Sequence, residues 1–278
     1  VCTAASPRER GKSERIIEEF MLSANEAAAK LAKEKQTPFV YRIHEAPPEG
    51  KVESLHEILP KFGLECPHFT EFRPVHASKI LEAARGTDKA EAVNMLVLRS
   101  MSKAKYSPEP LGHFGLALDD YAHFTSPIRR YPDLAIHRII TDIIAGYGSQ
   151  WLSKRYGGFA VNAAERSSSA EVRAATVERE CEDCYKAELM KQHIGETFRG
   201  RISGVTDFGF YVMLPDTIEG LVHIRTLPDG QYDYSEPVSL RESFSGVCYE
   251  LGMEIDVICA AVNVSDGTID FILDNEEE

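Results

Sequence analysis

The sequence lacks the features that direct a protein into or across a membrane. None of its apolar runs approaches the ~20 consecutive residues that span a bilayer. The opening stretch, VCTAASPRERGKSE, also lacks the apolar segment of a signal peptide. We therefore expect a cytoplasmic protein that has no membrane partner. Because the chain begins with Val1 rather than methionine, we also expect a processed chain or a piece of a longer protein.

Cysteines are few and follow no disulfide framework. Of the 6 in 278 residues, only Cys181 and Cys184 form a CxxC pair, inside the charged stretch ERECEDCYKAELM, which predicts a helix. A structural zinc site needs four ligands, and no second pair of cysteines or histidines lies at a suitable spacing. Reduced thiols without a function are the simplest interpretation. A metal- or thiol-dependent protein built on CEDC is the alternative.

Basic residues are outnumbered by acidic ones. The chain has 31 Lys and Arg against 44 Asp and Glu, which gives a net charge of −13. This excess of acid argues against a protein that coats nucleic acid with its whole surface, but it leaves a local basic groove open. Basic side chains are concentrated in YAHFTSPIRRYPDLAIHR, residues 121–138.

The apolar pattern changes near residue 195. Before it, apolar residues recur at helical spacing in RIIEEFMLSANEAAAKLAKEK (15–35), from Pro132 to Ala145, and in a long helix from Val161 to His193. After it come short strand-like runs bounded by glycines, among them FRGRISGV and FGFYVML. Five short strands in about 80 residues predict a small closed barrel, with an OB-fold as the leading candidate. The predicted fold class is therefore α+β, a mostly helical part followed by a β-barrel.

The basic stretch has the features of a phosphate site. Thr125-Ser126-Pro127 predicts a tight turn, in which either hydroxyl can cap backbone N–H groups. Pro132 suits the start of the next helix, so Arg129 and Arg130 precede a helix N-terminus, which favours anions. Arginine can also bind a phosphate through two donors at once. The alternative is an ordinary ion-pair cluster with structural histidines (Asp119, Asp120, Asp133, His123 and His137).

Three stretches resemble one known family. The run LRSMSKAKYSPEPLGHFGLALDDYAHFTSPIRRYPDLAIHR, residues 98–138, resembles the signature of the ribonuclease II/R (RNB) family. RIIEEFMLSANEAAA resembles a helix of this family, and ERECEDCYKAELMKQHIGETFRG resembles its junction with a trailing S1 RNA-binding domain. The resemblance implies a leader without a family match (1–14), the C-terminal part of an RNB catalytic domain (15–193), and an S1 domain of OB fold with a short acidic tail (194–278).

The resemblance implies a processive 3′→5′ exoribonuclease, a hydrolase that releases nucleoside 5′-monophosphates from single-stranded RNA. In this family two divalent ions, usually magnesium, activate water. Arg129, the first arginine of SPIRRY, would be catalytic by stabilising charge on the scissile phosphate. Glu19 and Glu178 would contact the terminal nucleotides, and the remaining RNA-binding residues would come from the motif (His123, Thr125, Ser126 and Arg130).

The family holds its metal ions with an aspartate-rich segment like DPxDAKDxDD, which this sequence does not contain. Residues 1–14 include no Asp, and no later stretch supplies three or four carboxylates at such spacing. We therefore predict no metal ligands in this chain, although the family implies Mg²⁺. The chain is expected to be inactive alone and to need the missing N-terminal half of the enzyme as a partner. The alternative is a non-catalytic protein that binds single-stranded RNA.

The stretch ISGVTDFGFYVMLPDTIEGLVHIRTL resembles the core of an S1 domain. Neighbours along a strand point to opposite faces, so one face enters the barrel and the other can offer aromatic rings to bases. The resemblance implies that Phe210 lies in the core. By the family pattern Phe208, Tyr211 and His223 would form an RNA-stacking platform. The alternative is that all these aromatics fill the core. We expect modest RNA affinity, because uncharged residues stand where S1 domains often carry charged ones (Asn263 and Thr268).

Overall fold

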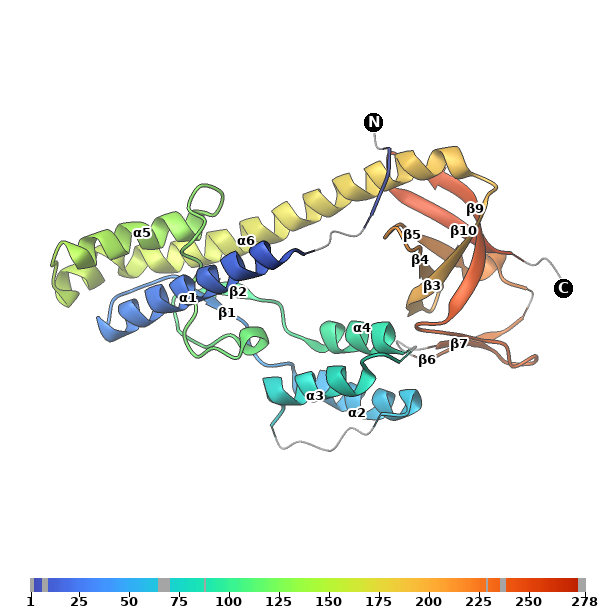
Figure 1. Cartoon of the computed structure of the whole chain (residues 1–278), viewed down its shortest axis with the longest axis horizontal. Helices are drawn as coiled ribbons and strands as arrows, with labels where there is room; N and C mark the ends of the chain where they lie inside the picture. The colour runs from blue at the N-terminus through green and yellow to red at the C-terminus, as the bar shows by residue number, and fades with distance from the viewer. Residues whose placement is uncertain are drawn as a thin grey trace.

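The computed structural model describes residues 3–6, 10–64, 71–87, 89–228, 230–235 and 239–274. Helices form one part of the molecule and strands the other, and the long helix α6 (Ser149–Met190) runs from one to the other (Figure 1). The predicted α+β fold class is confirmed. In the described part of the chain, no helix is both long and apolar enough to cross a bilayer. Two cysteines and the acidic end lie outside the described residues (Cys2, Cys66 and 275–278).

The first core lies where three helices pack around a two-stranded antiparallel sheet. The helices are α1 (Lys12–Glu34), α5 (Tyr131–Ile144) and the N-terminal half of α6, and the strands are β1 (Tyr41–Ile43) and β2 (Lys105–Ser107). Small side chains of α6 let α5 pack closely against it, and α1 adds small buried side chains while α5 contributes large ones. The buried set includes Ala28, Ala29, Ala32, Ala160, Ala163, Ile136 and Ile139.

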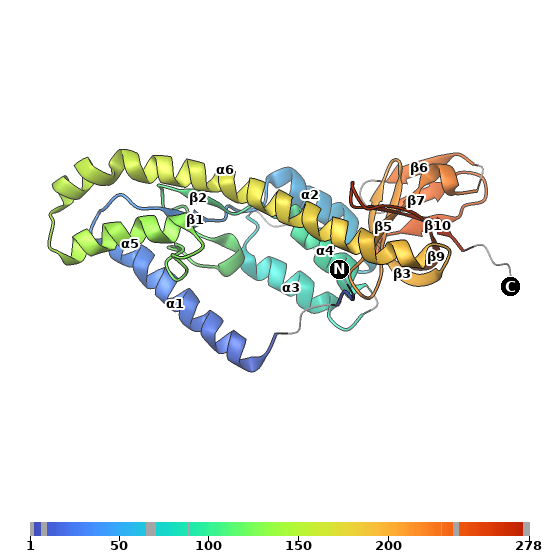
Figure 2. The ribbon, with the colours of Figure 1, turned by 90° about the horizontal axis from the view of Figure 1, so that it is seen from above.

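Only the C-terminal half of α1 is covered by this core. Its predicted apolar stripe includes Ile16, Ile17 and Phe20, but 58%, 58% and 69% of these residues is exposed. Figure 2 shows the N-terminal half of α1 running away from α6. Burial begins at Asn25, one turn before the alanines of the core. Apolar periodicity predicted the helix correctly, but it did not show which turns are covered.

A second core lies beneath α6 and includes α2 (Glu49–Ile58), η1 (Leu59–Phe62), α3 (Pro74–Ala84) and α4 (Ala90–Ser100). Helix α4 also contacts the barrel. Arg201 of the barrel pairs with Glu91 of α4 at 3.2 Å. Arg99 of α4 donates from Nη2 to the carbonyl of Ser203 at 3.2 Å. The barrel is therefore attached to the helical part through α4 as well as through α6.

Helix α6 begins at Ser149, not at Val161 as predicted. Two glycines in this extra segment each disfavour a helix by about 1 kcal/mol relative to alanine (Gly157 and Gly158). Burial at helical spacing overrides that preference (Leu152, Tyr156, Ala160, Ala163). The middle of α6 is mostly exposed, and its last turns enter the barrel core (Ala187 and Met190). One helix therefore contributes to two cores.

The C-terminal part is a closed five-stranded barrel in the order β10-β5-β4-β3-β9, which agrees with the predicted strand count. Its strands are β3 (Thr197–Thr206), β4 (Gly209–Met213), β5 (Glu219–His223), β9 (Glu254–Asn263) and β10 (Thr268–Leu273). Strand β10 closes the barrel by pairing with β9 and β5. Between β5 and β9 the chain adds a three-stranded sheet that the sequence did not predict, β6 (Tyr232–Ser235), β7 (Ser239–Glu242) and β8 (Cys248–Glu250).

We predict that Gly209→Ala destabilises the barrel by about 2–4 kcal/mol. Gly209 has φ +145°, and a Cβ there would lie 2.2 Å from the carbonyl oxygen of Val222 on the neighbouring strand. Calorimetric unfolding measures the effect. Gly158→Ala on α6 is the matched control, because no atom lies within 4 Å of its Cβ position, and it should stabilise the protein by about 0.5–1 kcal/mol. Equal melting temperatures for the two variants would contradict this assignment.

Candidate functional site

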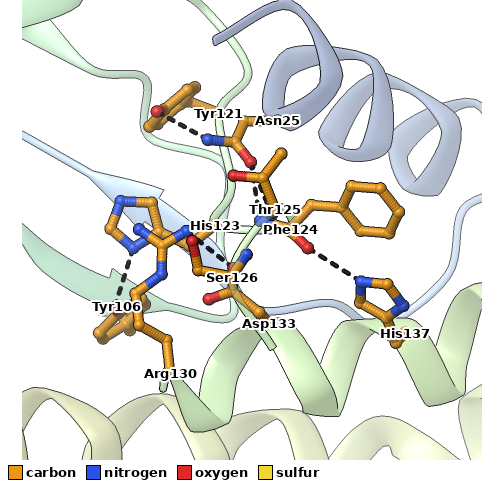
Figure 3. Close-up of polar contacts among 10 residues, drawn as sticks. All are labelled: Asn25, Tyr106, Tyr121, His123, Phe124, Thr125, Ser126, Arg130, Asp133 and His137. Carbon is orange, nitrogen blue, oxygen red and sulfur yellow. Dashed lines mark hydrogen bonds and ion pairs between the residues drawn. The ribbon is translucent and has the colours of Figure 1, made fainter. Parts of the chain in front are cut away.

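The loop at 121–130 is held by side chains of two helices (Figure 3). Asn25 of α1 accepts hydrogen bonds through Oδ1 from the backbone N–H groups of Phe124 (2.8 Å) and Thr125 (3.2 Å). Its Nδ2 donates to the hydroxyl of Tyr121 at 3.0 Å. On the other side, Nε2 of His137 donates to the carbonyl of Phe124 at 2.9 Å. The loop itself contains no helix or strand, so these side chains replace the backbone pairing that it lacks.

Asp133, in the first turn of α5, is the third anchor. Its Oδ1 accepts from the backbone N–H of Ser126 and from Nη2 of Arg130, both at 2.7 Å. The Asp133 side chain is fully buried, and a buried carboxylate is tolerated when it is paired and hydrogen-bonded. Arg130 therefore forms the ion pair with Asp133 that the sequence analysis gave as the alternative to a phosphate contact. Arg129 is exposed and forms no ion pair with any described residue.

The Thr125 and Ser126 hydroxyls do not cap the turn as the sequence suggested. Asn25 and Asp133 accept from those backbone N–H groups instead. Thr125 Oγ1 is buried without a hydrogen-bond partner among the described residues. Helix α5 starts at Tyr131, one residue before Pro132, and its N-cap residue Arg130 makes no side-chain cap. Caps supplied from two separate helices fix the turn more firmly than a local hydroxyl.

His123 lies behind Arg130 and is held neutral by its surroundings (Figure 3). Burial, followed by the nearby Arg130 and Arg42 guanidinium groups, lowers the pKa of His123 to about 3. Burial also raises the pKa of Tyr106 to about 12, so this phenol keeps its proton and donates to His123 Nδ1 at 2.9 Å. The Arg42 guanidinium lies 4.7 Å from the centroid of the Tyr106 ring. It also pairs with Glu171 of α6 at 2.5 Å.

A groove of about 1240 Å³ runs between the end of this loop and α6. Arg129 and Arg130 line it on the loop side, and Glu178 lines it on α6. Glu19 is exposed on α1 and is not among the described lining residues. Further basic and polar side chains reach the groove from α6 (Asn162, Arg166 and Arg173). The structure thus brings Arg129 and Glu178 to one groove but leaves Glu19 outside it.

The described residues offer no magnesium site. Among them, no group of three or more His, Cys, Asp or Glu side chains could hold a metal ion. Both carboxylate oxygens of Asp120 accept from Lys33 Nζ, at 2.7 and 2.9 Å. Asp133 is engaged by the loop, and Asp119 is exposed. The Mg²⁺ implied by the family therefore does not fit these side chains.

The CxxC pair does not form a metal cluster either. Cys181 is exposed and Cys184 is half-buried, and both are free thiols. The Cys184 thiol is 3.9 Å from the carbonyl of Ser265, in the turn between β9 and β10. Within the described part of the chain, no third ligand completes a site with them. The structure gives no support to a zinc protein built on CEDC.

On the barrel, three aromatic side chains gather at one place. Phe208 is 42% exposed. Its ring centroid is 6.4 Å from Tyr211, edge to face, and 6.5 Å from His223. Phe210 is fully buried and stacks on Tyr249 at 4.8 Å, so its expected core position is confirmed. The alternative in which every aromatic fills the core is wrong for Phe208, while the RNA-binding role of the three residues stays a prediction.

Several residues of the site could not be predicted from the sequence. Asn25 lies 96 to 100 positions before the loop atoms that it contacts. Tyr106 and Arg42 come from β2 and β1, and Glu171 comes from the middle of α6. No spacing rule links such distant positions. Of these contacts, only the one from Asp133 could be predicted, because this residue was one possible partner of the two arginines.

The neutral state of His123 predicts that stability falls in acid. The pKa of this imidazole drops from an ordinary 6.5 to about 3 on folding, so between these values the unfolded chain binds a proton that the folded chain does not. The stabilisation is complete above pH 6.5 and is lost as the pH falls toward 3, by up to ~1.4 kcal/mol per pH unit. Urea unfolding at a series of pH values should give a flatter slope for His123→Gln. An unchanged slope between pH 6.5 and 4 would show that His123 is not buried neutral.

Two family models match the chain, one described as the RNB domain over residues 2–146 and one as the S1 RNA binding domain over residues 191–266. Ribonuclease R of Aquifex aeolicus is 42% identical over 276 residues, which cover 98% of this chain and 38% of that protein. Ribonuclease R of Escherichia coli is 38% identical, covering 97% of this chain and 34% of that protein. The chain thus spans less than two fifths of the length of these relatives.

Solved structures show the same likeness. Mycoplasma genitalium RNase R, in complex with ribose-methylated single-stranded RNA, matches with a TM-score of 0.88 at 26% identity over 96% of this chain and 42% of that one. Yeast Ssd1, described as a pseudonuclease, shares the fold with a TM-score of 0.56 at 18% identity, over 94% of this chain and 31% of that one. The RNB match covers more than half of the chain. The chain belongs to the ribonuclease II/R (RNB) family.

Proposed function

We propose that this chain is the RNA-holding part of a processive 3′→5′ exoribonuclease that releases nucleoside 5′-monophosphates from single-stranded RNA. The observation that carries the proposal is the contrast between two adjacent arginines. Arg130 is neutralised by Asp133, whereas Arg129 is exposed at the groove and has no ion-pair partner in the described residues. An exposed guanidinium without an ion-pair partner can bind a phosphate through two donors at once.

In this proposal Arg129 contacts the scissile phosphate and stabilises the charge that develops there. Its planar donors can bind two phosphate oxygens at once. Such preorganised donors are among the largest contributions to catalysis of charge-forming steps. Glu178, on the opposite wall of the groove, would contact the terminal nucleotides. We keep Glu19 as a weaker candidate for the same role, because it lies outside the described lining of the groove.

The barrel would hold the RNA upstream of the groove. The exposed Phe208 lies in the turn before β4, and the half-buried Tyr211 and His223 lie beside it on β4 and β5. Bases stack on such rings without sequence preference. The likeness to an RNase R bound to single-stranded RNA supports this part of the proposal. We also propose that the protein is cytoplasmic. The four described cysteines are free thiols, which is usual for proteins of that compartment.

Hydrolysis would require carboxylates from another segment. The described residues contain no group that could hold magnesium, and the ribonuclease R relatives are more than twice as long as this chain. We therefore propose that a preceding RNB segment is the partner that completes the active site. The absence of a carboxylate group from the described residues also favours a second candidate, a non-catalytic protein that binds single-stranded RNA.

The experiment that separates these functions follows 5′-labelled oligo(A) on a gel, with Mg²⁺ and with EDTA. The 278-residue chain alone should bind the RNA without shortening it, and the chain joined to a preceding RNB segment should shorten it from the 3′ end. In the joined protein, Arg129→Ala should lower kcat by about 10²–10³-fold, well beyond the roughly tenfold loss of RNA affinity expected when one phosphate contact is removed. Arg85→Ala, which removes an exposed charge outside the groove lining, should have no effect.

The outcomes of this gel decide between the two candidate functions and test the role of Arg129. A magnesium-dependent ladder from the 278-residue chain alone would mean that it holds metal ions after all, and our account of the missing carboxylates would be wrong. Binding without shortening in the joined protein would favour the non-catalytic candidate. Unchanged turnover in Arg129→Ala would remove the role assigned to that residue.

We predict that Phe208→Ala combined with Tyr211→Ala weakens oligo(A) binding by at least tenfold. Base stacking contributes about 1–3 kcal/mol per base, and the two rings form one contact surface. Fluorescence anisotropy measures the affinity, and calorimetry checks that the barrel still folds. Phe244→Ala is the control, because Phe244 is 86% exposed but lies apart from these rings in the sequence and is not in contact with them. If both variants bind alike, the RNA contacts the barrel elsewhere.

A further inference from the structure

We propose that Asn25 and Asp133 are positioning residues that aim Arg129 into the groove. Neither needs to contact RNA. Both act by fixing the backbone of the loop from which Arg129 projects. This inference rests on the proposed role of Arg129 in RNA binding, and it adds the question of what holds that arginine in place.

The end of the loop has no packing of its own. Ile128 is fully exposed, and Arg129 beside it is also exposed. Between its two ends, the described backbone hydrogen bonds of this turn are internal, from Arg129 N–H (3.3 Å) and Arg130 N–H (3.0 Å) to the Ser126 carbonyl. A turn with no contact beyond itself points wherever its two ends direct it. The direction of Arg129 therefore depends on the anchors at 124–126 and at Arg130.

Those anchors are Asn25 and Asp133. Three successive backbone N–H groups, at 124, 125 and 126, donate to these two side chains and to no described backbone carbonyl. Asn25 is 2% exposed and Asp133 is fully buried, so water cannot readily replace either acceptor. Pro127 follows directly and restricts φ in the turn. The path from a fixed Ser126 to Arg129 is only three residues long.

The two anchors sit on different rigid elements. Asn25 belongs to the half of α1 that is covered by the first core, and Asp133 belongs to the first turn of α5. His137, one turn further along α5, adds the hydrogen bond to the Phe124 carbonyl and stacks on the Phe124 ring at 4.3 Å. The loop is therefore tied to both helices, and it moves only if they separate.

Asp133 also makes the two arginines unequal. It takes Arg130 as its ion-pair partner, and the Arg130 side chain is only 17% exposed. Without Asp133, two adjacent cations would compete for one phosphate and repel each other. With it, the net positive charge at the end of the loop belongs to Arg129 alone. Asp133 thus sets both the direction and the identity of the phosphate-binding arginine.

The test is a double-mutant cycle on the 278-residue chain, read by anisotropy of labelled oligo(A) over a range of salt concentrations. Arg129→Ala should raise Kd roughly tenfold and lower the slope of log Kd against log salt by about 0.7, the value for one phosphate contact on a single strand. Asn25→Ala should change both quantities in the same direction. Adding Arg129→Ala to Asn25→Ala should then raise Kd by less than about twofold further, because a misdirected Arg129 contributes little to RNA affinity.

Three variants keep the test clear of simple unfolding. Tyr121→Phe removes the partner of Asn25 Nδ2 but leaves both Oδ1 contacts, so it should bind RNA like the unmodified chain. Asn25→Asp keeps the acceptor oxygen and should restore binding to within about threefold. If Asn25→Ala does not fold, Asp133→Asn takes its place in the cycle. It keeps an acceptor for the Ser126 N–H but removes the charge that pairs with Arg130, so Arg130 can take the phosphate and the tenfold penalty of Arg129→Ala should fall below about threefold.

The outcomes separate this inference from the proposed function. If Arg129→Ala costs the full tenfold in the Asn25→Ala or Asp133→Asn background, the anchors do not position Arg129 and the inference is overturned, while RNA binding through Arg129 stands. If Arg129→Ala changes neither Kd nor the salt slope, the role of Arg129 fails and the inference fails with it. If the unmodified chain binds no oligo(A), the proposed function itself is wrong.

Discussion

The arrangement of the whole molecule depends on the continuity of α6. Its first turns are buried with α1 and α5, and its last turns are buried in the barrel, so a single rigid rod sets the distance between the groove and the aromatic side chains of the barrel. A rod alone would allow the barrel to rotate about its end. The ion pair between Arg201 and Glu91 and the contact from Arg99 to the Ser203 carbonyl oppose that rotation. An exposed ion pair is weak, but here it acts beside apolar packing, since Leu251 is buried among the helices.

An acidic protein can hold an anion if its few free cations are placed where the anion lies. The chain has a net charge of −13, yet the loop and α6 bring four arginines to the groove. Three glutamates line the same groove (Glu165, Glu171 and Glu178), so the arginines outnumber them by one, and Glu171 is already paired with Arg42. Interactions over more than ~8 Å are screened at physiological salt. The acidic surface elsewhere therefore has little effect on a phosphate in the groove.

Features with a short period were predictable from the sequence, and features that join distant segments were not. Strand alternation separated Tyr211 from the buried Phe210, and glycine-bounded runs predicted the five strands of the barrel. The short sheet β6–β7–β8 was missed, because its strands have three or four residues and too few alternations to form a pattern. The start of α6 was missed because two glycines lowered the local helix preference that packing then overrode. The motif around Arg129 was recognised from its order of residues, but the anchor at Asn25 could not be, because tertiary packing alone brings α1 to the loop.

The buried histidine completes the electrostatic design of the loop. His123 lies among the positive charges of Arg130, Arg42 and Arg129, and all three, together with burial, oppose its protonation. A protonated imidazole there would add a positive charge beside Arg130 and would repel it. Because the ring stays neutral, it can accept from Tyr106 and hold the base of the loop at physiological pH. The unpaired positive charge at the end of the loop then belongs to Arg129. The pairing of Asp133 with Arg130 and the neutrality of His123 therefore serve the same end, which is one defined positive charge at the exposed end of the loop.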